Sequence, residues 1–366
     1  MLTPAELSRY NRQLVLPELG LEGQQRLRES RVLAVGAGGL GSPVALYLAA
    51  AGVGTIGIVD DDVVEVSNLH RQVLHGTSDI GCKKTASAAD AIRRLNPHVL
   101  VREHQERFNA EGADSLLEGY DVIVDGSDNY PTRYAINDAC ARANKVWVYG
   151  SVEKFSGQVS VFGAPNGPCY RCIFPEPPSP RSTASCEEIG VLGAVPGVVG
   201  SLQATEALKW IAGIGEPLVG RLLQLDLEHG EIRTIHFERR KDCPTCSGRA
   251  DEVSAHSNGE TMEADIEPAE LARRLVESRP LQLLDIREPW EWSIGRIGEP
   301  ELLQMGELEG RVGELDQSRE LIVYCHHGTR SNLAAQWLRS RGYRARNLVG
   351  GIDRWSREID SSVPRY

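Results

Sequence analysis

Short apolar runs that end in glycine or aspartate alternate with helical patterns along the first two thirds of the chain. The stretch Gly41–Gly52 has a helical pattern that a glycine closes. Buried parallel strands are continuous apolar runs, and their alternation with helices predicts a doubly wound α/β sheet. The runs with this strand pattern are Arg31–Ala37, Thr55–Asp60, Asp121–Gly126 and Lys145–Ser151.

The last third of the chain repeats this alternation on a smaller scale. Leu281–Arg287 and Glu320–Cys325 have strand patterns, and Ser331–Tyr343 has the pattern of an amphipathic helix. Arg346–Gly351 then has the pattern of a closing strand. These patterns predict a second, smaller α/β domain.

A polar segment separates the two parts. It begins near Cys246, is rich in serine, glycine and charge, and has no apolar period, which is the composition of a linker. We therefore predict one domain over residues 1–247, a linker over 248–263 and a second domain over 264–366. Two domains also agree with 366 residues, a length above that of one ordinary core.

Charge and hydropathy exclude several classes of protein. Forty basic and fifty-one acidic residues give a net charge of −11, which argues against nucleic acid as the main partner. No apolar stretch has the length of a bilayer-spanning helix, and the first residues do not resemble a signal peptide. We expect a cytoplasmic protein whose eight cysteines stay reduced and serve as metal ligands, nucleophiles or core residues.

A glycine-rich loop predicts a nucleotide site. Gly36-Ala-Gly38-Gly39-Leu-Gly41 follows a strand and opens a helix, so its backbone N–H groups can face a phosphate. Asp60 ends the next strand, where a carboxylate can bind ribose hydroxyls. These residues fit an NAD-linked oxidoreductase as well as an ATP-dependent enzyme.

Polar residues that follow the loop favour ATP. Ser67, Asn68 and Arg71 form one cluster and Lys84 comes shortly after them. A triphosphate and its leaving pyrophosphate need such cations, whereas hydride transfer does not. Asp128 and Asn129 follow another strand, and a carboxylate there can hold Mg²⁺ with the phosphates. Taken singly, Arg71 and Lys84 would be surface charges.

Together with Arg9-Tyr-Asn-Arg12-Gln13, these motifs resemble the ubiquitin-activating-like adenylyltransferases of the MoeB/ThiF type, from about Arg9 to Cys246. Those enzymes activate the sulfur carriers of molybdopterin and thiamine synthesis. The resemblance implies a homodimer in which Arg12 reaches the ATP of the neighbouring subunit. It implies attack of a carrier's C-terminal glycine carboxylate on the ATP α-phosphorus, giving an acyl-adenylate and pyrophosphate. It also assigns phosphate to Gly39, ribose to Asp60, the nucleotide to Asn68, Arg71 and Lys84, and Mg²⁺ to Asp128.

Two C-x₂-C pairs predict a metal centre. Cys169 and Cys172 form one pair, and Cys243 and Cys246 form the other. Four thiolates from paired knuckles make a closed tetrahedral zinc site, although the long spacing requires the fold to bring the pairs together. A redox C-x-x-C would need only one pair at a strand–helix junction. We therefore expect structural Zn²⁺, and the family resemblance supports it.

Cys186 follows a proline-rich stretch and precedes a glycine-rich apolar helix. This context predicts a crossover loop that carries a thiol. In the resembling family, a cysteine at this position bonds covalently to the activated carrier in some members and is dispensable in others. No histidine adjoins Cys186 to lower its pKa, so a bystander role stays open.

A second thiol lies in the loop Cys325-His-His-Gly-Thr-Arg330-Ser331, between a predicted strand and a predicted helix. The loop amides, the helix dipole and Arg330 can stabilise a thiolate or a bound anion. Phosphate-ester hydrolysis and sulfur transfer both fit such a loop.

The segment from about Glu267 to Asp360 resembles a single rhodanese domain, through Asp285-Ile-Arg287, the Cys325 loop and Gly350-Gly351. Four residues separate Cys325 from Arg330, where the related phosphatases have five, which favours sulfane sulfur. The resemblance implies a Cys325 persulfide whose terminal sulfur Arg330 and the loop amides hold, while Asp285 and Arg287 brace the loop by pairing. Gly295-Arg-Ile297 departs from the usual Gly-His-Ile, outside the loop.

The sequence therefore predicts a two-step enzyme. ATP activates the C-terminal Gly-Gly carboxylate of a ubiquitin-like sulfur-carrier protein, and the Cys325 persulfide then gives a thiocarboxylate. The sulfur donor would be thiosulfate or a cysteine desulfurase. Cys186 would attack the acyl-adenylate or reduce the acyl-disulfide formed at Cys325. An NAD-dependent oxidoreductase and a non-catalytic carrier-docking scaffold are the alternatives.

Overall fold

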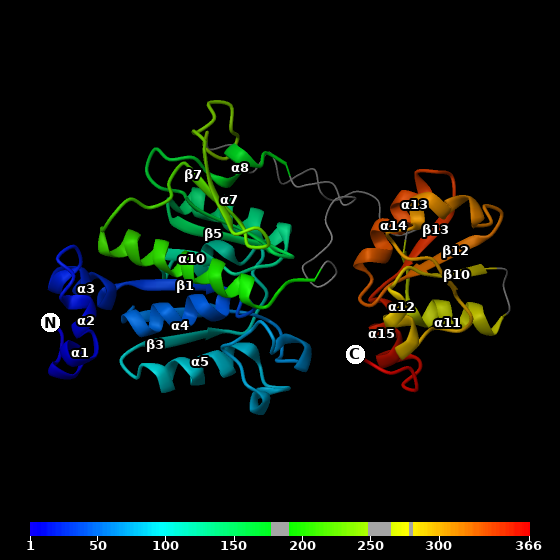
Figure 1. Cartoon of the computed structure of the whole chain (residues 1–366), viewed down its shortest axis with the longest axis horizontal. Helices are drawn as coiled ribbons and strands as arrows, with labels where there is room; N and C mark the ends of the chain where they lie inside the picture. The colour runs from blue at the N-terminus through cyan, green and yellow to red at the C-terminus, as the bar shows by residue number, and fades with distance from the viewer. Residues whose placement is uncertain (177–189, 248–264, 278–280) are drawn as a thin grey trace. The chain divides into compact units, whose positions relative to one another are not determined.

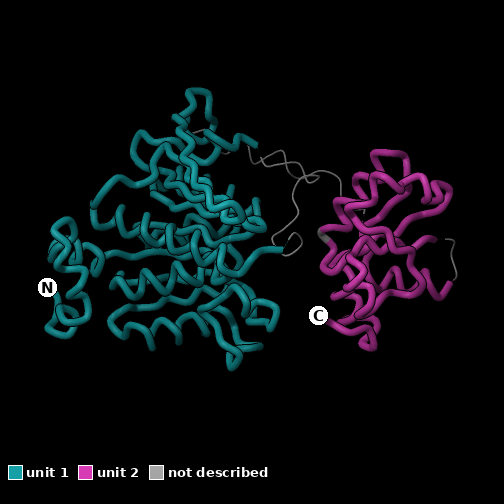
Figure 2. Tube along the Cα trace, in the orientation of Figure 1, with its two compact units in different colours: residues 1–177, 189–254 teal, residues 178–188, 255–366 magenta. Residues whose placement is uncertain are grey.

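The computed structural model describes residues 1–176, 190–247, 265–277 and 281–366 (Figure 1). The chain divides into two compact units, one N-terminal and one C-terminal, each with its own sheet (Figure 2). The linker predicted over 248–263 lies outside the described residues, so its exact bounds stay a prediction.

The N-terminal unit contains an eight-stranded sheet in the order β3-β2-β1-β4-β5-β6-β7-β8. Its first five strands are parallel, and β6, β7 and β8 extend the sheet antiparallel to their neighbours, which the apolar runs did not predict. The strands are β1 Arg31–Val35, β2 Thr55–Val59, β3 Leu100–His104, β4 Val122–Asp125, β5 Val146–Glu153, β6 Ser156–Phe162, β7 Arg221–Asp226 and β8 Glu231–His236.

Helices cover both faces of this sheet, as the doubly wound prediction requires. Val32 and Ala34 of β1 pack in one core with residues of α4 and α10. Leu33 and Val35, which alternate with them, pack in a second core with residues of α6 and α7. The helices are α1 Pro4–Arg9, α2 Asn11–Leu14, α3 Gly20–Glu29, α4 Gly41–Ala51, α5 Lys84–Leu95, α6 Ala113–Leu117, α7 Tyr130–Ala143, α8 Tyr170–Ile173, α10 Ala194–Ala212, and the 3₁₀ turns η1 Val66–Asn68 and η2 Thr77–Asp79.

The strand order places the candidate nucleotide site. The chain runs outward from β1 through β2 and β3, then returns to add β4 and β5 on the other side of β1. Sheets of this kind bind ligands in a crevice where the strand order reverses, a point that here lies beyond the carboxyl ends of β1 and β4. The glycine-rich loop follows β1, and Asp128 follows β4.

The C-terminal unit has a fully parallel sheet in the order β11-β10-β12-β13-β9. The predicted helix after Cys325 is present as α14, and the closing strand starts two residues earlier than its apolar pattern suggested. The strands are β9 Asp265–Ile266, β10 Leu281–Asp285, β11 Glu301–Leu302, β12 Glu320–Tyr324 and β13 Arg344–Leu348. The helices are α11 Pro268–Val276, α12 Pro289–Ile294, α13 Leu308–Arg311, η6 Val312–Glu314, α14 Thr329–Arg339 and α15 Gly351–Glu358.

No helix among the described residues has both the length and the apolar character needed to cross a bilayer. The predicted class, a Rossmann-like α/β domain with a smaller α/β domain, is confirmed.

Candidate functional site

The loop between β1 and α4 is packed so closely that two of its positions accept only glycine. Gly36 has a left-handed φ of 93°, and a Cβ on it would lie 2.8 Å from the Gly126 carbonyl oxygen. A Cβ on Gly41 would lie 1.9 Å from the Gly36 carbonyl oxygen. Glycine thus permits the tight turn from β1 into α4 and places the N-terminus of α4 next to the loop, a position that suits a phosphate.

Two side chains hold the peptide groups of Ala37 in this loop. Asp60 Oδ2 accepts a hydrogen bond from the Ala37 N–H at 2.8 Å. The ring of His75, which is buried and hydrogen-bonded to Ser87, contacts the Ala37 carbonyl oxygen through Nε2 at 3.0 Å. Burial lowers the pKa of His75, so a neutral ring supports the loop. The sequence analysis missed His75.

A buried lysine lies among the carboxylates of the candidate nucleotide site. Lys84 Nζ lies 2.8 Å from Asp62 Oδ2. Burial favours its neutral form, but the nearby carboxylates of Asp60, Asp62 and Asp128 outweigh that effect and raise the pKa of Lys84. The structure thus brings together the cation and both acids that the sequence proposed for one nucleotide. Asp62 was not among the predicted residues.

The cluster at Ser67 to Arg71 lies over the glycine-rich loop. Asn68 is buried and its Oδ1 accepts the Glu65 N–H at 3.1 Å, which fixes this turn. Arg71 donates to the Ser67 carbonyl oxygen at 3.0 Å, and its Cγ would lie 3.6 Å from a Cβ on Gly39. Arg71 therefore adjoins the glycine to which the family resemblance assigns phosphate binding.

Three other predicted residues have different surroundings. Asp128 is exposed beyond β4. Asn129 caps α7, because its side chain accepts the Thr132 N–H at 3.0 Å, and this cap gives Asn129 a structural role as well. Arg12 is exposed on the short helix α2. Its contact with a second subunit stays a prediction.

A buried polar network beneath β4 was not predicted. Arg133 Nε lies 3.2 Å from Asp125 Oδ2, and the Ser127 hydroxyl donates to Asp125 Oδ1. Gln203 of α10 donates to the Asp125 carbonyl oxygen at 2.6 Å. These bonds fix the turn that precedes Asp128. A signal was present in the sequence, since Gln203 interrupts an apolar helical run.

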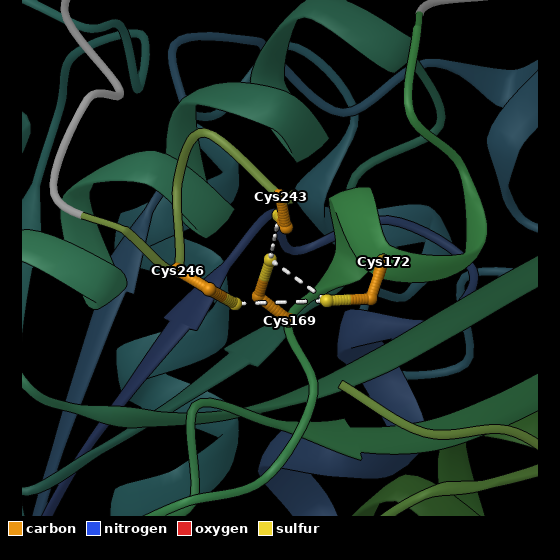
Figure 3. A group of neighbouring side chains, drawn as sticks. All are labelled: Cys169, Cys172, Cys243 and Cys246. Atoms are coloured by element: carbon orange, nitrogen blue, oxygen red, sulfur yellow. Dashed lines mark hydrogen bonds between the residues drawn. The ribbon is translucent and has the colours of Figure 1, made fainter. Parts of the chain in front are cut away.

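The four cysteines of the two C-x₂-C pairs meet in space, with their side chains pointing toward one another (Figure 3). Sγ–Sγ distances are 3.9 Å for Cys169–Cys172, 3.6 Å for Cys169–Cys243 and 3.6 Å for Cys172–Cys246. Tetrahedral Zn²⁺ with Zn–S bonds of about 2.3 Å sets sulfur atoms about 3.8 Å apart. The donor set and spacing therefore fit zinc.

The cysteine cluster is tied to α7, the helix that Asn129 caps. Asp138 of α7 binds Arg171 through both oxygens, at 2.9 and 2.8 Å, and also accepts the Thr245 hydroxyl at 3.2 Å. Arg171 lies between the first two cysteines and Thr245 between the other two. Both knuckles thus dock on one buried carboxylate.

In the C-terminal unit, Cys325 is fully buried at the end of β12. Its Sγ accepts the Gly328 N–H at 3.1 Å and lies 3.4 Å from the Ser331 hydroxyl. The first amides of α15 bind the loop carbonyls, with Ile352 N–H on Cys325 at 2.9 Å. This arrangement points donors at sulfur, as an anion-stabilising loop requires.

Arg330 is engaged by a residue that the sequence analysis missed. Its two terminal nitrogens bind the Glu291 carboxylate at 2.8 and 2.7 Å. Burial favours the protonated acid, but Arg330 and the Glu288 amide outweigh it and lower the pKa of Glu291. The predicted contact of Arg330 with a terminal sulfur stays a prediction. In the structure Glu291 is the third residue of α12, after the N-cap Glu288.

Asp285 and Arg287 pair as the resemblance implied. Both are fully buried, and Arg287 Nη2 lies 2.6 Å from Asp285 Oδ2. Arg287 also donates to the Gly295 carbonyl oxygen at 2.7 Å, which anchors the segment that departs from Gly-His-Ile. Cys186, the remaining predicted thiol, lies outside the described residues.

Comparison with known families decides the class. Residues 10–245 match the ThiF family. The chain belongs to the ThiF family. Residues 267–358 of this ThiF-family chain match the rhodanese-like domain. The resemblance of the C-terminal segment to a rhodanese domain is therefore also confirmed.

Relatives of this ThiF-family protein share both parts. It is 43% identical to the probable adenylyltransferase/sulfurtransferase MoeZ of Mycobacterium tuberculosis, over 100% of this chain and 96% of that protein. It is 39% identical to the adenylyltransferase and sulfurtransferase MOCS3-2 of Zea mays, over 99% of this chain and 82% of that protein. Among solved structures, E. coli MccB with MccA-N7isoASN aligns with a TM-score of 0.59 at 23% identity, over 66% of this chain and 74% of that one, which shows the fold alone.

The predicted enzyme class, adenylyltransferase and sulfurtransferase, is therefore confirmed for this ThiF-family chain. The relatives disagree with both alternatives, the NAD-dependent oxidoreductase and the non-catalytic scaffold. ThiF-family membership implies ATP as a substrate, while the cysteine cluster could bind zinc.

Proposed function

We propose that this protein adenylylates the C-terminal Gly-Gly carboxylate of a ubiquitin-like sulfur-carrier protein and then converts it into a thiocarboxylate. A carboxylate oxygen attacks the ATP α-phosphorus and pyrophosphate leaves. The coexistence in one chain of a nucleotide crevice and an anion-stabilising Cys325 loop carries the proposal. It agrees with relatives named for both activities.

The residues of the first reaction lie around the crevice. The backbone amides of the glycine-rich loop, that of Gly39 among them, would bind phosphate. Asp60 would bind ribose with the lone pairs that the Ala37 and Asp62 amides leave free. The nucleotide would further contact Ser67, Asn68, Arg71, Lys84 and Asn129. Asp128, exposed and within electrostatic range of Lys84, would hold Mg²⁺.

The second reaction would use the thiolate of Cys325. A donor such as thiosulfate transfers its sulfane sulfur to this thiolate, and sulfite leaves. The persulfide attacks the acyl-adenylate carbon and expels AMP, giving an acyl-disulfide. The Cys186 thiolate would then attack Cys325 Sγ, which releases the thiocarboxylate and leaves a Cys186–Cys325 disulfide for an external thiol to reduce. A persulfide on a cysteine desulfurase is the alternative donor.

A homodimer would complete the first site. Several apolar side chains are exposed near Arg12, which supports a subunit interface there. They are Val15 and Leu16, which follow Arg12 in the chain, and Leu21 of α3, each at least half exposed. Zn²⁺ on Cys169, Cys172, Cys243 and Cys246 would hold the end of the domain against α7.

The test is the intact mass of a Gly-Gly-ended carrier after incubation with this protein, Mg·ATP and thiosulfate, with each component omitted in turn. We expect a mass rise that corresponds to one oxygen replaced by one sulfur, only in the complete mixture. ATP–pyrophosphate exchange without that rise would overturn the sulfur-transfer half. The adenylation half would fail if the protein bound ATP and carrier but catalysed no exchange.

A further inference from the structure

Two buried ion pairs lie beside the Cys325 loop, and one tyrosine hydroxyl connects them. Asp285 pairs with Arg287, and Glu291 pairs with Arg330. Tyr366 Oη lies 2.6 Å from Arg287 Nη1 and 3.1 Å from Glu291 Oε1. A guanidinium only donates and a carboxylate only accepts. The hydroxyl therefore accepts from Arg287 and gives its single proton to Glu291.

This proton completes the coordination of Glu291. Arg330 supplies two donors at 2.8 and 2.7 Å, the Glu288 N–H supplies one at 2.9 Å, and Tyr366 supplies the fourth. A carboxylate has about four lone-pair sites, so Glu291 is saturated and its orientation is fixed. The two hydrogen bonds between Glu291 and Arg330 in turn fix the orientation of the Arg330 guanidinium.

The tyrosine ring also touches the loop itself. Its centroid lies 4.3 Å from that of His326, the residue after Cys325, in an edge-on arrangement, and 5.7 Å from that of Trp290. Burial raises the pKa of Tyr366. The hydroxyl thus stays a proton donor through the neutral range.

We propose that Tyr366 is a positioning residue for sulfur transfer at Cys325, which acts by fixing Glu291 and, through it, the Arg330 guanidinium beside the loop. This inference rests on the sulfur transfer proposed above. None of the three motifs that carry the rhodanese resemblance includes Tyr366. Its role follows from its contacts in the fold.

The test compares full-length wild-type protein with Tyr366→Phe, which keeps the ring and removes the hydroxyl. Cys325 is loaded with thiosulfate, excess donor is removed, and transfer of the sulfur to cyanide is followed in a single turnover as thiocyanate. We expect the rate to fall about three- to tenfold with the loss of one charge-assisted hydrogen bond. Because Glu291 loses a donor, its pKa rises and the acid limb of the pH profile moves to higher pH.

Tyr343→Phe is the matched control. Tyr343 is buried in the same unit, and its hydroxyl donates to the Val312 carbonyl oxygen at 2.7 Å, away from the Glu291 pair. It should lose stability like Tyr366→Phe yet keep the wild-type pH profile. A pH profile and rate in Tyr366→Phe equal to those of Tyr343→Phe would overturn the proposal.

A second variant separates positioning from general stability. Glu291→Gln removes the charge, so the acid limb due to Glu291 should disappear, and adding Tyr366→Phe should then change the rate little. If the effects of Glu291→Gln and Tyr366→Phe on the transfer rate were fully additive, the proposed coupling of Tyr366 to Glu291 would be contradicted. If wild-type protein transferred no sulfur, the proposed function would fail separately. In that case the positioning role of Tyr366 would be tested by the pH dependence of Cys325 alkylation by iodoacetamide. The same pH profile of alkylation in Tyr366→Phe as in the wild type would overturn that role.

Discussion

Gly41 lies so close to Gly36 that a Cβ on Gly41 would stand 1.9 Å from the Gly36 carbonyl oxygen. Backbone, not a flexible side chain, occupies that space, so the loop must distort if Gly41 is substituted. The contact joins the end of β1 to the start of α4 and defines the shape of the loop that we propose binds phosphate.

We therefore expect Gly41→Ala to weaken ATP binding by at least tenfold and to lower the free energy of unfolding by about 2 kcal/mol or more. Gly197→Ala in α10 is the control. A Cβ there meets no atom within 4 Å, so alanine should be neutral or slightly stabilising. Calorimetric ATP titration and thermal unfolding measure both effects. Unchanged ATP affinity in Gly41→Ala would refute the predicted site.

Cys325→Ala should keep ATP–pyrophosphate exchange and lose sulfur transfer, because the thiol lies in a unit separate from the nucleotide crevice. Radiolabelled pyrophosphate exchange and carrier mass are the two readouts. Cys82→Ala, which removes an exposed thiol of the N-terminal unit, should leave both unchanged. A fall in exchange as large as the fall in transfer would contradict this division of labour.

Asp128→Ala should abolish both exchange and transfer, since without Mg²⁺ the pyrophosphate leaving group lacks charge compensation. Losses of about 100-fold or more in exchange rate are expected. Asp90→Ala removes another exposed carboxylate, one that pairs with Arg93 on the surface, and should have little effect. Full exchange in Asp128→Ala would remove Asp128 from the Mg²⁺ role.

Removal of the metal should destabilise the N-terminal unit. Cys243→Ser should abolish stoichiometric zinc and lower Tm by about 10 °C or more, because metal binding to four thiolates contributes directly to folding. Cys82→Ser should keep zinc and Tm. Metal analysis with differential scanning calorimetry makes the comparison, and wild-type Tm in a zinc-free variant would show that the centre is dispensable for folding.

The C-terminal unit should lose stability as pH falls from about 6.5 toward 4. Burial, reinforced by the neighbouring His327, lowers the pKa of His326 from 6.5 to about 4. Below pH 6.5 the unfolded chain binds a proton that the folded chain does not, so acid favours unfolding through this group. Urea unfolding at several pH values, followed by tryptophan fluorescence, should show a shallower decline in His326→Gln. Parallel curves would contradict the assignment.

The local patterns in the sequence were sufficient for the elements that carry each site. Apolar runs predicted β1, β2, β4 and β12, and glycine spacing predicted the loop that opens α4, because backbone conformation and strand burial depend on near neighbours. The two C-x₂-C pairs predicted a zinc site, since the ligand type and the spacing within each pair are local features of the sequence. The family resemblances added the nucleotide and persulfide roles.

Only the tertiary structure revealed the partners of these groups. His75 on Ala37, Glu291 on Arg330 and Tyr366 on Glu291 join residues 38, 39 and 75 positions apart in the chain. No local pattern encodes such contacts. The sequence determined which chemical groups this protein has and on which elements they lie. The fold decided which groups meet, because most buried polar atoms pair with whichever group packing brings beside them.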